Sequence, residues 1–550
     1  MSTTIDPTWT ELSAKLQTNP SDFTTWESLL DHSTKNLSKI TPEETLTRFR
    51  ICYDSALSRY PNLEQYWINY ASWEYKLGYT ERCLDIYNRA LTIIPSSLKI
   101  WCEYLEFLSY KAGYSYETVL KKYQEAEVLI GDHYHSFGFW KGYLKFEKLY
   151  QGKSIYYYNL LKKCLDLPLY HYAEFFSMWF KEIDSMTKDT APMIIKKEEL
   201  PKKFKITEAQ LSAKGVTDSM IADLKVKLKK IYTDVYITTQ FKSHELFKYE
   251  NQIKLEYFVP NVYKSYQELT NWDQYLTFIS KNPSNANSSA KATQRSVNLF
   301  ERALISLASY PQFWIQYAEY HLSQGNTLDA KNILYRSLQY LNEGNNLPVY
   351  NLIIDLELSL NEYGKVYELI RSLLEYREVV SLELYLRFIE VQYLFMINDK
   401  EGKNSDNSKG QFKRYIVDLF DSGSISLNFQ TSILVHLFEY FKDESINNLS
   451  FLTELNKDDK FNACIEYHMI RLKLSLHSNG KNKNKISELN KLYFDIYSNF
   501  QNDEEARDKL DHWFEMYLSY QQHDESGDER TEDSLGRLFE IDCLRTFNDF

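Results

Sequence analysis

Two histidines, His133 and His135, are close enough in the sequence to suggest a metal site. They stand in the stretch GDHYHSFGFW, and imidazole nitrogens are common ligands of zinc and other transition metals. A closed zinc site needs further ligands, and neither a Cys nor another clear donor lies beside this pair in the sequence. We therefore expect both histidines to lie in a loop or at the start of a helix, with no metal bound.

Other chemical signatures are also missing from the sequence. It contains no phosphate-binding G-x-x-x-x-G-K-[ST], no dinucleotide-binding G-x-G-x-x-G and no H-E-x-x-H zinc motif. Carboxylates are abundant, but no pair stands out for acid–base catalysis. The six cysteines form no C-x-x-C pair, so we expect reduced structural thiols. The sequence predicts a protein that is not an enzyme, with no catalytic, cofactor-binding or metal-binding residues.

A lysine-bearing segment, residues 184–230, is the remaining candidate for chemistry, here with nucleic acid. It holds 11 Lys against 7 acidic residues, whereas the whole chain has a net charge of −12. Residues 501–550 carry 15 acidic and 5 basic residues, which suits solubility or a basic partner. Two interpretations of the segment stay open: a solvated face, or weak RNA or partner contact. The candidate contacts are Lys196, Lys197, Lys202, Lys203, Lys227, Lys229 and Lys230.

The elements that would position any site are repeats. A Leu precedes a Trp by ten residues at Leu57 and Trp67, and again in the stretches LTIIPSSLKIW and LISLASYPQFW. After each Trp, aromatic residues recur at intervals of three, which places them on one stripe of a helix that must be buried. The five triplets are Trp67, Tyr70 and Trp73; Trp101, Tyr104 and Phe107; Trp140, Tyr143 and Phe146; Trp272, Tyr275 and Phe278; and Trp314, Tyr317 and Tyr320.

Each aromatic helix is predicted to form a hairpin with the helix that follows it. Four glycines, Gly78, Gly113, Gly152 and Gly325, stand where the first helix of a pair should close in a left-handed conformation. Small residues such as Ala90 in the second helix would let two helix backbones approach. Successive Trp positions lie 34, 39 and 42 residues apart, as in helical hairpin repeats that stack into a superhelix.

Charged residues next to the repeat positions suggest ion pairs that hold hairpins in register. Glu74 and Glu147 directly follow aromatics of the first helices, and Arg89 and Arg302 directly precede an Ala of the second helices. We expect buried or half-buried Glu–Arg pairs within or between hairpins, with a structural role.

These patterns predict an all-α fold, an α–α superhelix (solenoid) of tetratricopeptide-like helical hairpin repeats in two arrays. The first array should cover residues 1–183. A lysine-bearing connector and a long linking helix follow at 184–240. The second array, at 241–550, has degenerate repeats beyond residue 348 and an acidic end. No stretch is long and apolar enough for a membrane span and the N-terminus lacks a signal peptide, so we expect an intracellular protein without a membrane partner.

The repeats resemble the half-a-tetratricopeptide, or HAT, repeat, because Tyr and then Trp or Phe, often followed by Glu, stand where ordinary tetratricopeptide repeats have Leu-Gly and Tyr. Known HAT proteins act as scaffolds in RNA processing. The aromatics could also form a base-stacking platform, but their regular spacing favours core packing.

A longer resemblance spans residues 20–390. The stretch HELFKYENQIKLEYFVPNVYKSYQELTNWDQYLTFI, followed by LFERALISLASYPQFW, is similar to the middle signature of the pre-mRNA-processing factor 39 and factor 42 family. Glu256 departs from it, since animal members have Arg-Pro there. The lysine-bearing connector and the Tyr- and Asn-rich composition resemble the fungal factor 42 branch more than the factor 39 branch.

The resemblance implies a nuclear, non-catalytic scaffold of the fungal U1 small nuclear ribonucleoprotein (U1 snRNP) that acts in 5′ splice-site recognition and bridges core and auxiliary proteins. It also implies pairing with a related HAT-repeat splicing factor through the C-terminal array, as a heterodimer or a homodimer. Contact with U1 snRNA or pre-mRNA could then be indirect. Two alternatives remain: a HAT scaffold of polyadenylation or ribosomal-RNA processing, and an RNA-binding protein that uses the 184–230 segment.

Overall fold

The computed structural model describes residues 7–35, 37–195, 218–260, 262–281, 289–341, 346–376, 382–398, 405–421, 426–441, 448–457, 459–478, 483–500 and 503–524. Within these ranges the chain forms 25 α-helices and no β-strand. The prediction of an all-α fold built from helical hairpins is therefore confirmed. No helix in the described ranges combines the length and the apolar character that crossing a membrane requires.

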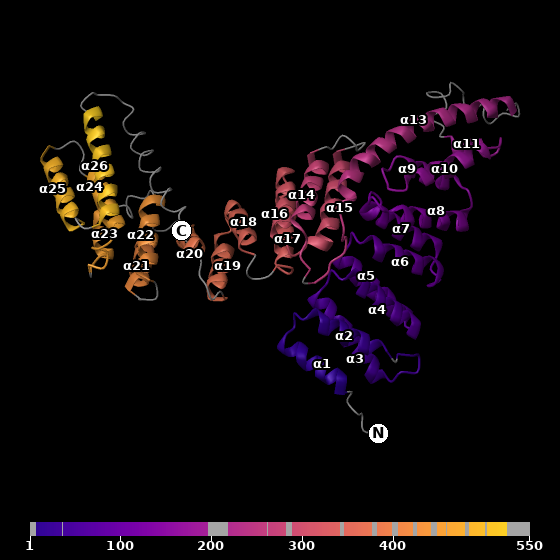
Figure 1. The fold of residues 1–550 in the computed structure, drawn as a ribbon, viewed down its shortest axis with the longest axis horizontal. Helices are drawn as coiled ribbons and strands as arrows, with labels where there is room; N and C mark the ends of the chain where they lie inside the picture. The colour runs from indigo at the N-terminus through magenta and orange to yellow at the C-terminus, as the bar shows by residue number, and fades with distance from the viewer. Residues whose placement is uncertain are drawn as a thin grey trace. The chain divides into compact units, whose positions relative to one another are not determined.

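The helices keep one numbering throughout (Figure 1). Their bounds are α1 Pro7–Thr18, α2 Phe23–Thr34, α3 Glu43–Arg59, α4 Glu64–Leu77, α5 Thr80–Ile93, α6 Leu98–Tyr110, α7 Tyr116–Ile130, α8 Phe137–Gln151, α9 Ile155–Leu165, α10 Tyr172–Asp184, α11 Ala191–Ile194, α13 Asp218–Glu250, α14 Tyr266–Lys281, α15 Ser289–Leu307, α16 Pro311–Ser323, α17 Thr327–Ser337, α18 Leu347–Ser359, α19 Tyr363–Tyr376, α20 Leu382–Asn398, α21 Ser405–Asp421, α22 Leu427–Tyr440, α23 Leu449–Leu455, α24 Ile465–Ser478, α25 Lys483–Asn499 and α26 Glu504–Asp524.

The pair α4 and α5 shows why the sequence folds into hairpins. Helix α4 ends at Gly78, whose φ of 97° lies in the left-handed region that suits a residue without a Cβ. The chain then reverses and α5 packs against α4. Ala71 on α4 and Ala90 on α5 are fully buried, so the two backbones can approach closely. The other three predicted closing glycines also have positive φ angles, which confirms the helix ends inferred from the sequence.

The chain divides into two compact units, Met1–Ile353 and Ile354–Phe550. The first unit holds the predicted first array, the long helix and the first hairpins of the predicted second array. The predicted linking helix is α13, which has 33 residues. The division of the repeats into arrays at residues 183 and 241 stays a prediction, because it describes sequence repeats rather than compact units.

The first unit folds back on itself. Helices α1 to α10 follow one another as stacked hairpins, and α13 then packs against α9 and α10 (Figure 1). Beyond α13 the chain reaches α15, which contacts α7 near the middle of the first array. Helices more than 150 residues apart in sequence thus lie side by side, and the α5–α6 and α7–α8 turns line one cavity with α14 and α15.

Two apolar clusters lie within the described residues of the second unit. The first lies among α20 to α24 and includes Phe412, Ile433 and Phe461. The second lies among α24 to α26 and includes Tyr493 and Trp513. The beginning of the acidic C-terminal region, up to Asp524, is therefore a packed helix.

Candidate functional site

The predicted repeat core lies where a structural role requires it. The first two residues of each triplet, a Trp and a Tyr, are at most 3% exposed in all five triplets. Of the third aromatics, Phe107 and Phe146 are buried, whereas Trp73, Phe278 and Tyr320 are half-buried. Rings enclosed in this way cannot stack on the bases of an RNA strand, because stacking needs an accessible ring face.

Several of the indoles also tie their hairpin to the turn before it. The N–H of Trp67 donates a hydrogen bond of 2.9 Å to the carbonyl of Pro61, six residues earlier. Trp101 and Trp314 make the same bond to Pro95 and Ala308. Trp26 repeats it with the carbonyl of Pro20, which reveals a repeat in α2 that the sequence analysis did not include.

Buried Glu–Arg pairs are present, but only some of the predicted partners are right. Glu74 is fully buried and binds Arg50 of the preceding helix at 2.7 Å and 3.1 Å. The pair raises the pKa of Arg50 above its ordinary value, chiefly through the hydrogen bond with Glu74. The predicted Glu147 accepts hydrogen bonds from two hydroxyl groups instead, from Tyr116 and Ser154.

The predicted arginines behave differently from each other. Arg89 forms an exposed pair with Asp54 at 3.0 Å, which contributes little because water and salt screen it. Arg302 is buried and binds Glu250 through two parallel hydrogen bonds of 2.6 Å and 2.7 Å. Arg302 is therefore the arginine around which a buried polar site is built.

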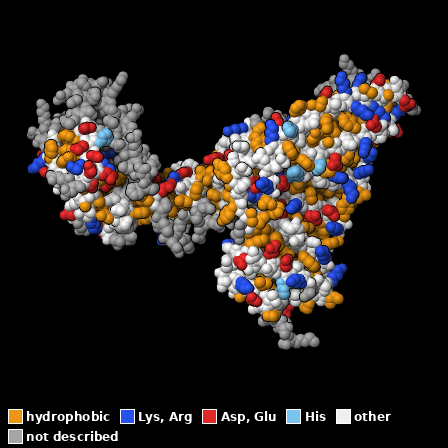
Figure 2. Space-filling model, in the orientation of Figure 1, with side chains coloured by type: hydrophobic (Ala, Val, Ile, Leu, Met, Phe, Trp, Pro, Cys, Tyr) orange, Lys and Arg blue, Asp and Glu red, His pale blue; other side chains and the backbone are white. Residues whose placement is uncertain are grey.

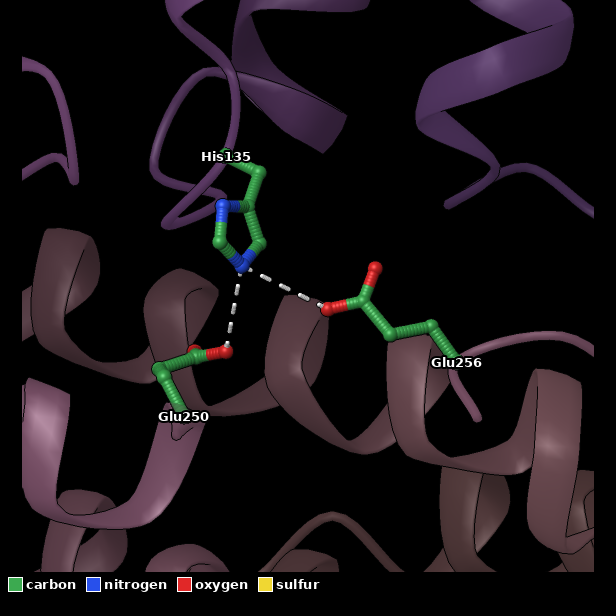
Figure 3. A group of neighbouring side chains, drawn as sticks. All are labelled: His135, Glu250 and Glu256. Carbon is green, nitrogen blue, oxygen red and sulfur yellow. Dashed lines mark ion pairs between the residues drawn. The ribbon is translucent and has the colours of Figure 1, made fainter. Parts of the chain in front are cut away.

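This site, which we call the junction cluster, comprises His135, Glu250, Glu256 and Arg302. Glu250 ends α13, Glu256 lies in the loop after it, Arg302 lies on α15, and His135 comes from the turn between α7 and α8. Arg302 also binds Glu256 at 2.6 Å. The imidazole Nε2 of His135 points at both carboxylates, 4.0 Å from Glu250 and 3.7 Å from Glu256 (Figure 3).

Burial and pairing oppose each other in the junction cluster. Burial alone would raise the pKa of the Glu250 carboxyl, but the charge and hydrogen bonds of Arg302 outweigh it, so that pKa lies below its ordinary value. Burial alone would lower the pKa of Arg302, and Glu250 followed by Glu256 raises it instead. The Tyr275 hydroxyl donates a further hydrogen bond of 2.7 Å to Glu250. One guanidinium and two carboxylates thus form a structural ionic network.

The junction cluster has the donor types of a metal site but not its charge balance. Ligand atoms of His135, Glu250 and Glu256 all lie within 4.8 Å of one another. However, the guanidinium of Arg302 already binds both carboxylates, and a divalent cation there would have to displace it or face its positive charge. The cluster therefore fits a fixed ionic contact better than a metal centre. The other histidine of the GDHYHSFGFW stretch, His133, is not in this set.

The structure describes only three of the seven candidate lysines. Lys227 and Lys230 are exposed on α13, whereas Lys229 binds Asp184 at 2.5 Å. Lysine and hydrophobic side chains lie next to each other along α13 (Figure 2). Lys196, Lys197, Lys202 and Lys203 lie outside the described residues, so the proposed contact surface stays a prediction.

Comparison with known families adds to this geometry. Residues 10–181 match the family model of the PRP39 N-terminal HAT repeat, and residues 244–393 match that of the PRP39 C-terminal HAT repeat. These two matches cover more than half of the chain. The chain belongs to the PRP39 HAT-repeat family. Both matched regions contain junction residues, His135 in the first and Glu250, Glu256 and Arg302 in the second.

Individual members of the PRP39 HAT-repeat family are also similar to this chain in sequence. The U1 small nuclear ribonucleoprotein component PRP42 of Saccharomyces cerevisiae is 31% identical, over 67% of this chain and 66% of the relative. Pre-mRNA-processing factor 39 of Schizosaccharomyces pombe is 25% identical, over 60% and 53%. Factor 39 of S. cerevisiae is 24% identical, over 50% and 36%. The resemblance stated from the sequence is confirmed, and the higher identity to PRP42 than to factor 39 of the same yeast agrees with the factor 42-like assignment.

The matches leave part of each relative uncovered. The chain aligns with about two thirds of the PRP42 relative and about half of the fission yeast factor 39.

Proposed function

We propose that the chain is a non-catalytic scaffold of a U1 snRNP that acts in pre-mRNA splicing. The observation that carries the proposal is the similarity to the U1 component PRP42 along two thirds of the chain. The structure supports it, because the aromatic and charged residues that stood out in the sequence pack the repeats or pair with one another. On this proposal the protein works in the nucleus, bridging core and auxiliary proteins of the particle during 5′ splice-site recognition.

Depletion from a splicing-competent extract tests this function. Removal of the protein should reduce binding of the U1 particle to a pre-mRNA with an intact 5′ splice site, and the purified full chain should restore it. A pre-mRNA with a mutated 5′ splice site is the control. Unchanged U1 binding after complete depletion would contradict the proposal and favour a scaffold of another RNA-processing complex.

Pairing with a related HAT-repeat protein is the second part of the proposal. The apolar residues Ile433, Leu434 and Leu437 of α22 are fully buried within the second unit, so they offer no surface to a partner. Exposed apolar side chains remain at Leu427 and at Phe494, which is 60% exposed. Phe494 is the most exposed of the large apolar side chains described in the second unit, so we test the contact with a partner there.

The pairing prediction is tested with the full chain, because α14 to α17 pack within the first unit and a fragment starting at residue 241 would lose those contacts. Sedimentation velocity at micromolar concentration should show a dimer, alone or with a factor 39-type relative. Phe494→Asp should weaken the dimer at least tenfold by placing a charge in an apolar contact. The matched control is Tyr263→Asp, which changes an exposed residue of the first unit. Monomers in every mixture would contradict the pairing.

Weak RNA contact through α13 is a second candidate function, favoured by the exposed Lys227 and Lys230. Changing these two and Lys196, Lys197, Lys202 and Lys203 to Gln should keep the helical content and reduce RNA binding. It should also flatten the dependence of affinity on salt, because fewer counterions are released. Fluorescence anisotropy with a labelled single strand measures both. Tight, sequence-specific binding that survives these changes would contradict a weak electrostatic contact.

A further inference from the structure

A cavity opens beside the junction cluster, inside the first unit. It is lined from the first array by Ser96, which follows α5, and by His133 in the turn between α7 and α8. From the other side it is lined by Arg295 and Arg302 of α15. The space inside it that a water-sized sphere can occupy is about 30 Å³, and the cavity opens to solvent. This is more than the roughly 10–15 Å³ that one water molecule needs, so the enclosed part can hold a small polar group, and the rest of a larger ligand would extend into solvent.

Two side chains that line this cavity each have one buried polar atom without a hydrogen-bond partner among the described residues. The guanidinium of Arg302 uses its two terminal nitrogens for Glu250 and Glu256, which leaves the Nε–H without a hydrogen bond within the described residues. The Oγ of Ser96 is also buried without a partner among them, and both residues are only 5% exposed. Buried polar groups without partners are rare in folded proteins and point to a bound water or ion.

Two more donors line the same cavity. Arg295 is half-buried and makes no hydrogen bond or ion pair in the part of the chain that the structure describes. His133 accepts a hydrogen bond from the backbone N–H of His135 at its Nδ1. A neutral imidazole with an accepting Nδ1 carries its proton on Nε2, so His133 also offers an N–H donor.

Four polar groups in this cavity can each donate a hydrogen bond, and they come from the first array and from α15. Arg302, Arg295 and His133 offer N–H groups and Ser96 offers an O–H, while Asp132 is the one carboxylate among the lining residues. Asp132 opposes the charge of Arg295, and Glu250 and Glu256 together outweigh the charge of Arg302, so the lining would hold an anion through its hydrogen-bond donors rather than through a net positive charge. Convergent N–H and O–H donors with an arginine are what tetrahedral oxyanions bind, and a metal ion would find too few acceptors.

We propose that this cavity binds a phosphate-type oxyanion as a small molecule, either inorganic phosphate or the phosphoryl group of a small phosphate ester. Arg295 supplies the charge-assisted hydrogen bonds, and Ser96 and the Nε–H of Arg302 supply the buried ones. The anion bridges the α5–α6 and α7–α8 turns to α15. It therefore stabilises the contact between the first array and the hairpins beyond α13, since a ligand that binds only the folded state shifts the equilibrium toward it.

The test uses the full chain with sodium phosphate, with glucose 6-phosphate and with sodium chloride at the same ionic strength. Thermal unfolding and titration calorimetry should show saturable binding and a rise in melting temperature with phosphate, with the ester, or with both, but not with chloride. The two phosphate arms distinguish the free ion from the ester.

Variants assign the binding to this cavity. Arg295→Gln and, separately, Ser96→Ala should weaken binding, the first at least tenfold, while the melting temperature in chloride stays close to that of the parent. Arg82→Gln removes an exposed arginine on α5 and is the matched control, with binding unchanged. The proposal would be overturned if neither small anion binds saturably. It would also be overturned if the parent and both cavity variants bind equally well. Binding of an RNA oligonucleotide alone, without either small anion, would overturn it in favour of a nucleic-acid contact.

Discussion

Trp314→Ala should destabilise the first unit by about 3–5 kcal/mol, the usual cost of truncating a large buried aromatic side chain. The indole is 1% exposed and donates a hydrogen bond of 2.8 Å to the carbonyl of Ala308. The guanidinium of Arg336 lies 5.1 Å from the centre of the indole ring, and the ring of Tyr340 stacks on the indole at 5.6 Å. Trp67→Ala should have a similar effect, because Trp67 occupies the same position of an earlier repeat. Urea unfolding followed by circular dichroism at 222 nm measures the loss.

The matched control for Trp314→Ala is Tyr263→Ala. Tyr263 is 86% exposed, so its removal should change stability by less than about 0.5 kcal/mol. Trp314→Phe should fall between the two, because it keeps most of the apolar volume and loses the indole hydrogen bond. If both Trp→Ala variants unfold at the urea concentration of the parent protein, these residues do not form the repeat core.

Arg302→Met should cost about 3–5 kcal/mol, the range for removing one partner of a buried ion pair. The substitution leaves the Glu250 carboxylate, 1% exposed, without its guanidinium partner. Glu250→Gln in the Arg302→Met background should recover part of the loss, because the amide carries no charge. A double-mutant cycle of urea unfolding free energies measures the coupling between the two side chains.

Acid unfolding is a second test of the pair between Glu250 and Arg302. The pKa of Glu250 is lowered in the folded state, so its pairing contributes stability above the ordinary pKa of a carboxyl group. That contribution is lost as the pH falls through the lowered value. Arg302→Met should therefore lose less stability than the parent between pH 5 and pH 2. Equal losses in both proteins, together with additive effects in the double-mutant cycle, would show that the pair is not coupled.

The sequence predicted the repeat core because its signal is local. Trp and Leu ten residues apart, and aromatics three apart, follow from helix geometry and the need to bury one stripe. The same rule would have found Trp26, since Leu16 stands ten residues before it. At three of the four turns where an indole bonds the carbonyl six residues earlier, that earlier residue is a Pro, which the sequence shows directly. Trp513 was missed because it stands among acidic residues.

The junction cluster could not be predicted because its contacts are not local. His135 lies 115 residues before Glu250 in the sequence, and no periodic pattern links them. Arg302 was a candidate for a buried pair, but its partner depends on how α13 returns the chain to α7. Arg89 and Arg302 share one position of the repeat, and only Arg302 is covered by another part of the fold. Tertiary packing therefore decides which of two equivalent residues becomes buried.

Recovery of RNA with the tagged full chain from a native extract is the most direct test of the scaffold function. The account predicts that U1 snRNA is enriched over the other small nuclear RNAs, together with U1 proteins and a related HAT-repeat protein. It also predicts that the purified chain alone does not bind naked U1 snRNA tightly at physiological salt. Enrichment of polyadenylation or ribosomal-RNA processing factors without U1 snRNA would contradict the account.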